Sequence, residues 1–192
     1  MDNHDKPGPF AEDDSKNPPA KSILDRLIRR FSRPAYVIVV LLLYLLASTA
    51  LGLALAPALF FFSQVFAWGQ NLHQFLYWLV LGLGLAISFF IFGLSLLFVV
   101  STYNWLLPTR VRPFKGGYYS LKAVPWFLHN GLFYLVRFTF LPFVTLTPFS
   151  IWFLKAMGMN LGRHVFINTE YISDPQLITL GDDVALGGSV RI

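Results

Sequence analysis

Between Arg33 and Arg110 the chain contains no aspartate, glutamate, lysine or arginine. A transmembrane helix needs about 20 consecutive apolar residues, so this run is long enough for two crossings. We expect the first crossing from about Ala35 to Phe62 and the second from about Phe75 to Leu107. The whole chain is 55% hydrophobic and only 13% charged, which is unlike a soluble globular protein. The sequence therefore predicts a helical membrane hairpin over residues 35–107.

Positive charge borders this hairpin on both sides. The basic residues that we expect at the membrane surface are Arg26, Arg29, Arg30 and Arg33 before the hairpin and Arg110 and Arg112 after it. Because cytoplasmic flanks carry the excess of lysine and arginine, this pattern predicts a multi-pass protein of the plasma or inner membrane with both termini in the cytoplasm. The expected partner of these arginines is a lipid bilayer that contains anionic lipid.

The same distribution of charge argues against two functional classes. The basic residues border apolar segments and form no separate basic domain, so nucleic acid is not an expected partner. Neither expected crossing contains an Asp, Glu, Lys or Arg that could mark an ion or substrate path, so a pore or a transporter is disfavoured.

The segment before the hairpin divides in two. Residues 1–20 are polar and rich in proline, and we expect a disordered cytoplasmic tail. Residues 21–34 place isoleucine, leucine and phenylalanine on one helical face and arginine on most of the rest. This pattern is typical of a basic amphipathic helix that lies on a membrane. A merely solvated cluster of charges next to the membrane is the alternative.

Small residues recur every four positions along the first expected crossing. One series is Ser48, Gly52 and Ala56, and a second is Ala50, Ala54 and Ala58; Gly84 and Ser88 form a matching surface on the second crossing. Small residues let two membrane helices approach closely, so we expect them at the interface of the hairpin. Pro57 is a possible kink in the first helix.

Residues 108–157 are expected to form a basic loop followed by interfacial or re-entrant helices. This segment is apolar, but Arg137 falls within it and Pro142 and Pro148 interrupt it. We expect two helices broken near Pro142, with Arg137 and Lys155 reaching lipid headgroups. A third and a fourth crossing are the alternative.

Residues 158–192 show a hexad repeat. The aliphatic residues that mark its rungs are Leu161, Ile167, Leu180, Leu186 and Ile192, each six residues from the next except across one slip. A second register follows four residues behind at Val165, Tyr171, Val184 and Val190. A strict period of six is neither helical nor alternating, and it is typical of a parallel β-helix. An ordinary hairpin with "GDD" as its turn is the alternative, but it does not explain matched registers on both sides of the slip.

The corners of this repeat are predicted to need glycine or asparagine. Gly162, Asn168, Gly181 and Gly187 follow the rungs directly, which suits a backbone that turns with positive φ. The slip falls in residues 173–176, "SDPQ", where an extruded turn is expected.

The order "GGYYSLKAVPWFL", "FLPF", "TPFSIWFLKAMGMNLGRHVFIN" and "DPQLITLGDDVALGGSV" resembles the membrane-linked hexapeptide-repeat acyltransferases with a left-handed β-helix. The likeness is greatest to the C-terminal membrane module of ε-poly-lysine-synthetase-like proteins, which are related to non-ribosomal peptide synthetases, and to its stand-alone relatives. It covers residues 110–192 and the general layout of the helices. The resemblance implies a triangular prism, often trimeric, a histidine as general base, and acyl-CoA as the donor of the complete enzyme.

No catalytic residue can be assigned from the resemblance. His164 stands at an early corner and is expected to be solvated, and neither His73 nor His129 has a carboxylate partner in the sequence. Asp182 and Asp183 are adjacent and are expected to serve the turn rather than acid–base chemistry. The chain contains no cysteine, which excludes thiolate sites, and no metal site is predicted.

Three functions remain open from the sequence. The first is the membrane-anchored N-terminal part of a hexapeptide-repeat acyltransferase that acts on an amine or hydroxyl acceptor. We expect this part to be inactive alone, because residues 158–192 supply an incomplete β-helix on which a downstream chain or a second copy would stack. The second is a non-catalytic membrane adaptor whose β-helix docks a partner in a peptide-synthetase-like assembly. The third is the remnant of a split or shortened gene.

Overall fold

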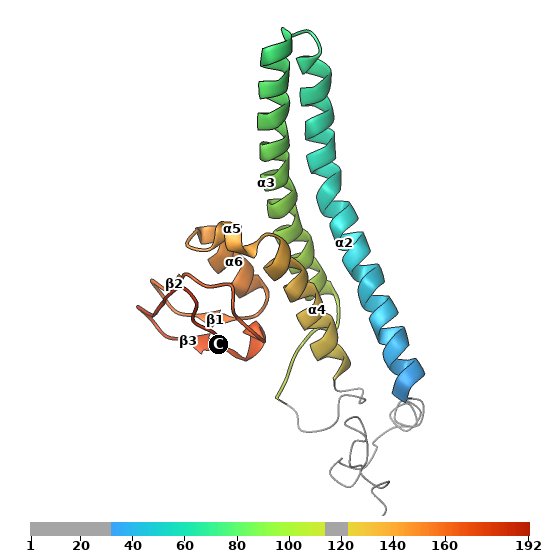
Figure 1. Ribbon diagram of the computed structural model, residues 1–192. Helices are drawn as coiled ribbons and strands as arrows, with labels where there is room; N and C mark the ends of the chain where they lie inside the picture. The colour runs from blue at the N-terminus through green and yellow to red at the C-terminus, as the bar shows by residue number, and fades with distance from the viewer. Residues whose placement is uncertain (1–31, 114–122) are drawn as a thin grey trace, which may run out of the picture.

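A computed structural model describes residues 32–113 and 123–192 of the protein. The predicted tail and most of the predicted basic helix, with Arg26, Arg29 and Arg30, lie outside the described residues. The described part is mostly helical, and four short strands gather toward its C-terminal side (Figure 1).

Two long antiparallel helices dominate the structure. Helix α2 spans Ser32–Gly69, helix α3 spans Gln74–Leu106, and a tight turn joins them at one end (Figure 1). Both are long and apolar enough to cross a membrane, and no other helix in the described ranges meets that test. Helix α2 extends beyond the predicted crossing at both ends and continues through Pro57.

The contact between α2 and α3 uses only one of the two small-residue series. Ala50, Ala54 and Ala58 are buried, whereas Ser48, Gly52 and Ala56 are exposed. On α3, a Cβ added at Gly84 would lie 2.6 Å from Cγ1 of Val65, and Ser88 is buried beside it. Ala50, Ala54 and Ala58 therefore let the helices approach, whereas Ser48, Gly52 and Ala56 face away from α3.

Three shorter helices rise along α3 and return. Helix α4 spans Val124–Thr139, α5 spans Leu141–Val144, and α6 spans Pro148–Ala156 (Figure 1). Their bend follows Phe140, in agreement with the predicted break near Pro142, and the Phe140 ring fills the space that a side chain at Gly93 would occupy. Sixteen and nine residues are too few to cross a bilayer, so α4 and α6 are not a third and a fourth crossing.

Arg137 differs from the expectation that it reaches headgroups. Its Nη1 donates to the carbonyl of Ile172 at 3.3 Å, and its guanidinium carbon lies 5.3 Å from the centre of the Tyr134 ring and 5.5 Å from that of Tyr171. The side chain therefore joins α4 to the segment that carries the strands. Lys155 at the end of α6 is exposed, so its ammonium group is free to meet headgroups.

The hexad segment folds into two successive turns that stack in parallel. Strand β1 (Asn160–Leu161) pairs with β3 (Thr179–Leu180), and β2 (Phe166–Ile167) pairs with β4 (Ala185–Leu186). The register places Leu161 opposite Leu180 and Ile167 opposite Leu186. A short 3₁₀ turn, η2 (Pro175–Leu177), lies between the two turns of chain, where the slip in the repeat was predicted.

A third contact closes the same arrangement on another side. The N–H of Ile192 donates to the carbonyl of Tyr171 at 3.1 Å, and the N–H of Ser173 donates to the carbonyl of Ile192 at 2.7 Å. Ile172 therefore lies opposite Ile192 in parallel register, and Ile172 is fully buried. Among the described residues, parallel pairing is limited to these three contacts. The described residues therefore show two stacked turns and do not show the predicted left-handed β-helix.

The corners differ from the prediction. Left-handed backbone occurs at His164, Asp183 and Ser189, and not at the glycines that follow the rungs. Gly162 is required for another reason, because a Cβ there would lie 2.5 Å from Oδ1 of Asp182 and 2.6 Å from its backbone nitrogen. Close approach of the two stacked turns, rather than backbone conformation, thus demands glycine at this corner.

One hydrophobic core runs from the helices into the first turn of the hexad segment. Phe133 of α4 stacks on Phe153 of α6, with ring centres 5.9 Å apart. The same cluster continues through Met157 and Met159 to Leu161, Ile167 and Ile172. In addition, the N–H of Leu146 donates to the carbonyl of Ile167 at 3.3 Å. The helices α5 and α6 therefore cover one end of the stacked turns.

Candidate functional site

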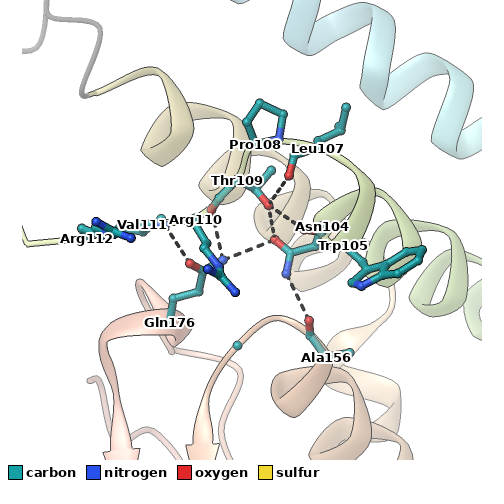
Figure 2. A pocket seen from close by; sticks show the side chains of 11 residues that line it. Asn104, Trp105, Leu107, Pro108, Thr109, Arg110, Val111, Arg112, Ala156 and Gln176 are labelled. Carbon is teal, nitrogen blue, oxygen red and sulfur yellow. Dashed lines mark hydrogen bonds between the residues drawn. The ribbon is translucent and has the colours of Figure 1, made fainter.

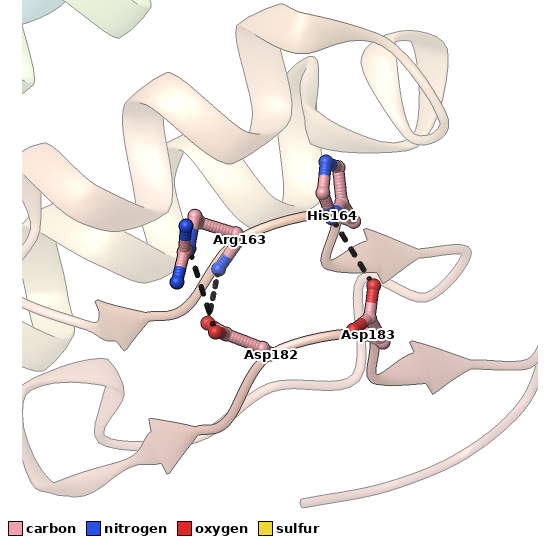
Figure 3. Close-up of polar contacts among 4 residues, drawn as sticks. All are labelled: Arg163, His164, Asp182 and Asp183. Atoms are coloured by element: carbon pink, nitrogen blue, oxygen red, sulfur yellow. Dashed lines mark hydrogen bonds and ion pairs between the residues drawn. The ribbon is translucent and has the colours of Figure 1, made fainter.

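The first candidate site is the corner where the two stacked turns meet (Figure 3). Asp182 accepts the backbone N–H of Arg163 at 2.7 Å, and its carboxylate lies 3.5 Å from the Arg163 guanidinium. Asp183 lies 3.1 Å from Nδ1 of His164. All four side chains are largely exposed, and each carboxylate is directed to its own partner. The two aspartates therefore tie one turn to the next, and they do not act on one common atom.

This corner still contains one group with chemical potential. His164 is held by a carboxylate at Nδ1, which leaves Nε2 directed away from that contact, and a histidine held in this way can accept a proton. The left-handed backbone of both His164 and Asp183 places the pair in register across the two turns. The sequence marked His164 and Asp183 separately, but their pairing depends on the stacking.

The second candidate site is a cavity of about 810 Å³ at the C-terminal end of α3, here called the foot of α3 (Figure 2). Its walls come from the end of α3, the segment after it, the end of α6 and the turn η2. The lining residues used below are Asn104, Thr109, Arg110, Arg112 and Gln176. Arg110 and Arg112 were predicted to lie at the membrane surface, and both are exposed where they line the cavity.

A polar network forms the inner wall of this cavity. Gln176 accepts the N–H of Val111 at 2.7 Å and donates to the carbonyl of Thr109 at 3.1 Å. Asn104 donates to the carbonyl of Ala156 at 3.1 Å, and the Thr109 hydroxyl donates to the carbonyl of Asn104 at 2.7 Å. Through these bonds the network joins α3, the segment after α3, α6 and η2.

His129 of α4 lies against this network and is fully buried. Its Nδ1 lies 2.9 Å from Oδ1 of Asn104 and 3.0 Å from Nε2 of Gln176. One of these bonds forms in each neutral tautomer, because a protonated Nδ1 donates to Asn104 and a bare Nδ1 accepts from Gln176. Nε2 has no hydrogen-bond partner among the described residues.

Burial therefore keeps this ring neutral. Desolvation lowers the pKa of His129 from 6.5 to about 4, and the negative charge of Asp174 opposes the shift only in part. Asp174 accepts hydrogen bonds from Trp126 and Asn130, each at 2.7 Å, and it adopts a left-handed backbone at the start of η2. No local sequence pattern indicates this network, because its members are separated by up to 72 residues.

The predicted rung residues divide between the two turns. Leu161 and Ile167 of the first turn are buried, Leu180 and Leu186 of the second are half-buried, and Ile192 is exposed. Of the remaining predicted surface residues, Arg33 lies in α2. In residues 32–113 and 123–192, no three His, Asp or Glu side chains gather closely enough to hold a metal ion.

Comparison with known proteins places the chain in no family. No family model, no curated protein and no solved structure matches it.

Proposed function

We propose that this protein is a membrane-anchored hexapeptide-repeat module for acyl transfer from acyl-CoA to an amine or hydroxyl acceptor on the cytoplasmic side. The observation that carries the proposal is the parallel stacking of two successive turns, with Leu161 on Leu180, Ile167 on Leu186 and Ile172 on Ile192. Three stacked contacts for each turn of chain fit the start of a triangular prism, and the resemblance in sequence implies that this prism is left-handed.

The anchor supports the same proposal. Two helices long and apolar enough to cross a membrane share a continuous core with the first stacked turn. The exposed Arg110 and Arg112 lie at the foot of α3, where anionic headgroups would hold them. A prism fixed at this position would act on acceptors that arrive at or near the membrane.

We expect little or no turnover from these residues alone. The second turn is open, with Leu180 and Leu186 only half-buried, so a donor bound along it would stay in contact with solvent on one side. The pair of His164 and Asp183 has the chemistry of a general base, but both side chains are largely exposed to solvent. A base of that kind needs a substrate held within about 3 Å of Nε2, and a further stacked surface would have to supply that wall.

A membrane adaptor is the second candidate, and the free strand edges favour it. Strands β3 and β4 each pair on one edge only, and no other strand in the described ranges lies on their second edge. An unpaired parallel edge offers backbone hydrogen bonds to another chain, which is a known mode of docking. A second copy of this protein or a downstream chain of a synthetase-like assembly would pair there.

Photolabelling with an acyl-CoA analogue distinguishes the two functions. The purified protein in lipid nanodiscs is irradiated with an analogue that carries a photoreactive group on the pantetheine arm, and the adducts are mapped by mass spectrometry. The acyl-transfer proposal expects adducts within residues 160–192 that excess acyl-CoA removes and that free fatty acid leaves in place. Adducts confined to the hairpin, or adducts that acyl-CoA does not compete away, would contradict it and leave the adaptor.

A further inference from the structure

The bend between α4 and α6 lies at a fixed depth along the hairpin. Phe89 of α3 packs against Phe143, with ring centres 4.9 Å apart, and against Phe140, at 5.6 Å. At about 1.5 Å per residue, α3 is about 50 Å long and Phe89 lies about 22 Å from its first residue. The hydrocarbon core of a bilayer is about 30 Å thick. Whether this core starts at the first residue of α3 or stops at its last residue, it includes the level of Phe89.

The surface at this depth is apolar. The exposed large side chains that surround the bend are Phe138, Phe143, Leu146, Phe149, Trp152 and Phe166. None of them carries a charge, and they come from α4, α5, α6, the turn between α5 and α6, and strand β2. If the hairpin is tilted, the length of α3 and the distance from its first residue to Phe89 both shorten along the membrane normal by the same factor. The bend therefore stays within the apolar layer. In a hairpin that spans the membrane, this surface therefore contacts lipid.

A pocket of about 320 Å³ lies beside this surface, between α6 and the stacked turns. Leu146, Pro148 and Ile151, from α6 and the turn before it, form one wall, and Val165, Phe166 and Ile167 form the opposite wall. Thr147 is the only polar side chain among the described residues that line the pocket, and its hydroxyl already donates to the carbonyl of Val144 at 2.6 Å. The side chains of the pocket thus offer no free donor, and an apolar occupant fits them best.

Backbone strain is found at the mouth of the same pocket. Leu146 has φ of 68°, a left-handed conformation that is unfavourable for a leucine. The bond from its N–H to the carbonyl of Ile167 holds it there, and its side chain is exposed. Strained residues of this kind gather at ligand sites, because the surrounding structure must maintain them.

We propose that this pocket binds the end of one acyl chain of a membrane phospholipid, which enters from the leaflet that surrounds the bend. If a methylene group takes about the volume of a water molecule, roughly 30 Å³, the pocket holds roughly ten of them. The chain would lie between the anchor and the stacked turns, against Val165 and Ile167. This inference rests on the membrane position of the hairpin and does not depend on acyl transfer.

The test uses the full chain reconstituted in phosphatidylcholine vesicles with two photoreactive lipids. One carries a diazirine at the end of an acyl chain and the other carries it on the headgroup. We expect the chain-end probe to label Ile151, Val165 and Ile167 as well as the exposed hairpin residues Leu79 and Leu83, and the headgroup probe to label none of these pocket residues. Free dodecanoate added to the vesicles is expected to leave the pattern unchanged, because the occupant is part of a phospholipid.

Variants that fill the pocket make the test specific. Val165→Trp and, from the opposite wall, Ile151→Trp should each abolish chain-end adducts in the pocket while labelling of Leu79 persists. Leu177→Trp, which enlarges an exposed residue outside the pocket by the same amount as Ile151→Trp, is the matched control and should change nothing. Chain-end adducts on Phe149 and Trp152 with none on Val165 or Ile167 in the unaltered protein would overturn the proposal, since lipid would then touch the surface without entering. Loss of the adducts with free dodecanoate would overturn the phospholipid as the source.

Discussion

The side-chain oxygen of Gln176 accepts the backbone N–H of Val111 at 2.7 Å, across 65 residues of chain. The amide nitrogen of the same side chain donates to the carbonyl of Thr109 and lies 3.0 Å from the His129 ring. One side chain of the η2 turn thus satisfies backbone groups of the segment that leaves α3. The stacked turns are fixed to the foot of the hairpin by hydrogen bonds as well as by the hydrophobic core.

Removing the Gln176 side chain should weaken the attachment of the stacked turns to the end of α3. Gln176→Ala leaves the N–H of Val111 and the carbonyl of Thr109 without their partners, and each such loss in a part-buried site costs about 1–3 kcal/mol. We expect a lower melting temperature in detergent and faster hydrogen exchange at Val111. Gln70→Ala, in the exposed turn between α2 and α3, is the control and should have no effect. Equal melting temperatures for both variants would contradict this role of Gln176.

The buried ring of His129 should make the protein sensitive to acid. The pKa of His129 in the folded protein is about 4, below its usual 6.5, so the unfolded chain binds the proton first as the pH falls. The stabilisation from the neutral ring is therefore complete above about pH 6.5 and is lost progressively down to about pH 4, by up to roughly 3 kcal/mol. The measurement is the melting temperature from pH 7.5 to 4 for the unaltered chain and for His129→Gln.

The slope of melting temperature against pH should be smaller in His129→Gln, whereas His73→Gln, in the turn between α2 and α3, should keep the slope of the unaltered protein. A slope that is the same in all three proteins would assign the acid sensitivity to other groups.

The two turns should respond differently to truncation of paired residues. Ile172 is fully buried and Ile192, opposite it, is 38% exposed. Ile172→Ala should destabilise the stacked turns by about 2–5 kcal/mol, because it leaves a cavity in the core. Ile192→Ala should change stability by only about 0.5 kcal/mol. Hydrogen exchange of the amides of Gly162 and Asn168, which bond across the turns, measures both effects. An equal response to the two changes would refute the burial of Ile172.

The charge pattern predicts a membrane topology that can be tested by labelling. The chain contains no cysteine, so a single introduced thiol is unambiguous. A cysteine at Gln70, in the turn between α2 and α3, should react with an impermeant maleimide added to intact cells. A cysteine at Gly188, in the exposed second turn of the hexad segment, should react only after the cells are opened. The reverse pattern would place the hexad segment outside the cell.

Much of the architecture can be predicted from local sequence. The absence of charge between Arg33 and Arg110 predicts two long apolar helices, and the proline after Phe140 predicts the bend. The hexad spacing predicts parallel stacking of successive turns, and the structure pairs Leu161 of the first turn with Leu180 of the second. Such features depend on neighbours in the chain and so can be recognised without a structure.

The features that were missed depend on contacts between distant segments. On the side of the stacked turns that is closed by the contact with Ile192, the fully buried residue is Ile172. Ile172 comes one position earlier than a strict step of six residues from Ile167, so only its pairing with Ile192 identifies it. The wrong assignment of positive φ to the rung glycines has the same origin, since Gly162 is required by the approach of Asp182. The network of Asn104, His129 and Gln176 assembles from three elements and has no signature in any one of them.

The cover that α5 and α6 place over the first turn gives the stack an order of assembly. Parallel strands form slowly because their pairing must first close a long loop, and the loss of chain entropy precedes the contacts. Here Leu146 and the core residues of α6 already present a surface on which the first turn can settle, with Ile167 bonded to Leu146. We therefore expect the hairpin and the helices α4, α5 and α6 to fold first in the membrane and to serve as the template for the first of the stacked turns. Each later turn would then need only the preceding one as its template, and growth would proceed in a single direction, away from α5 and α6.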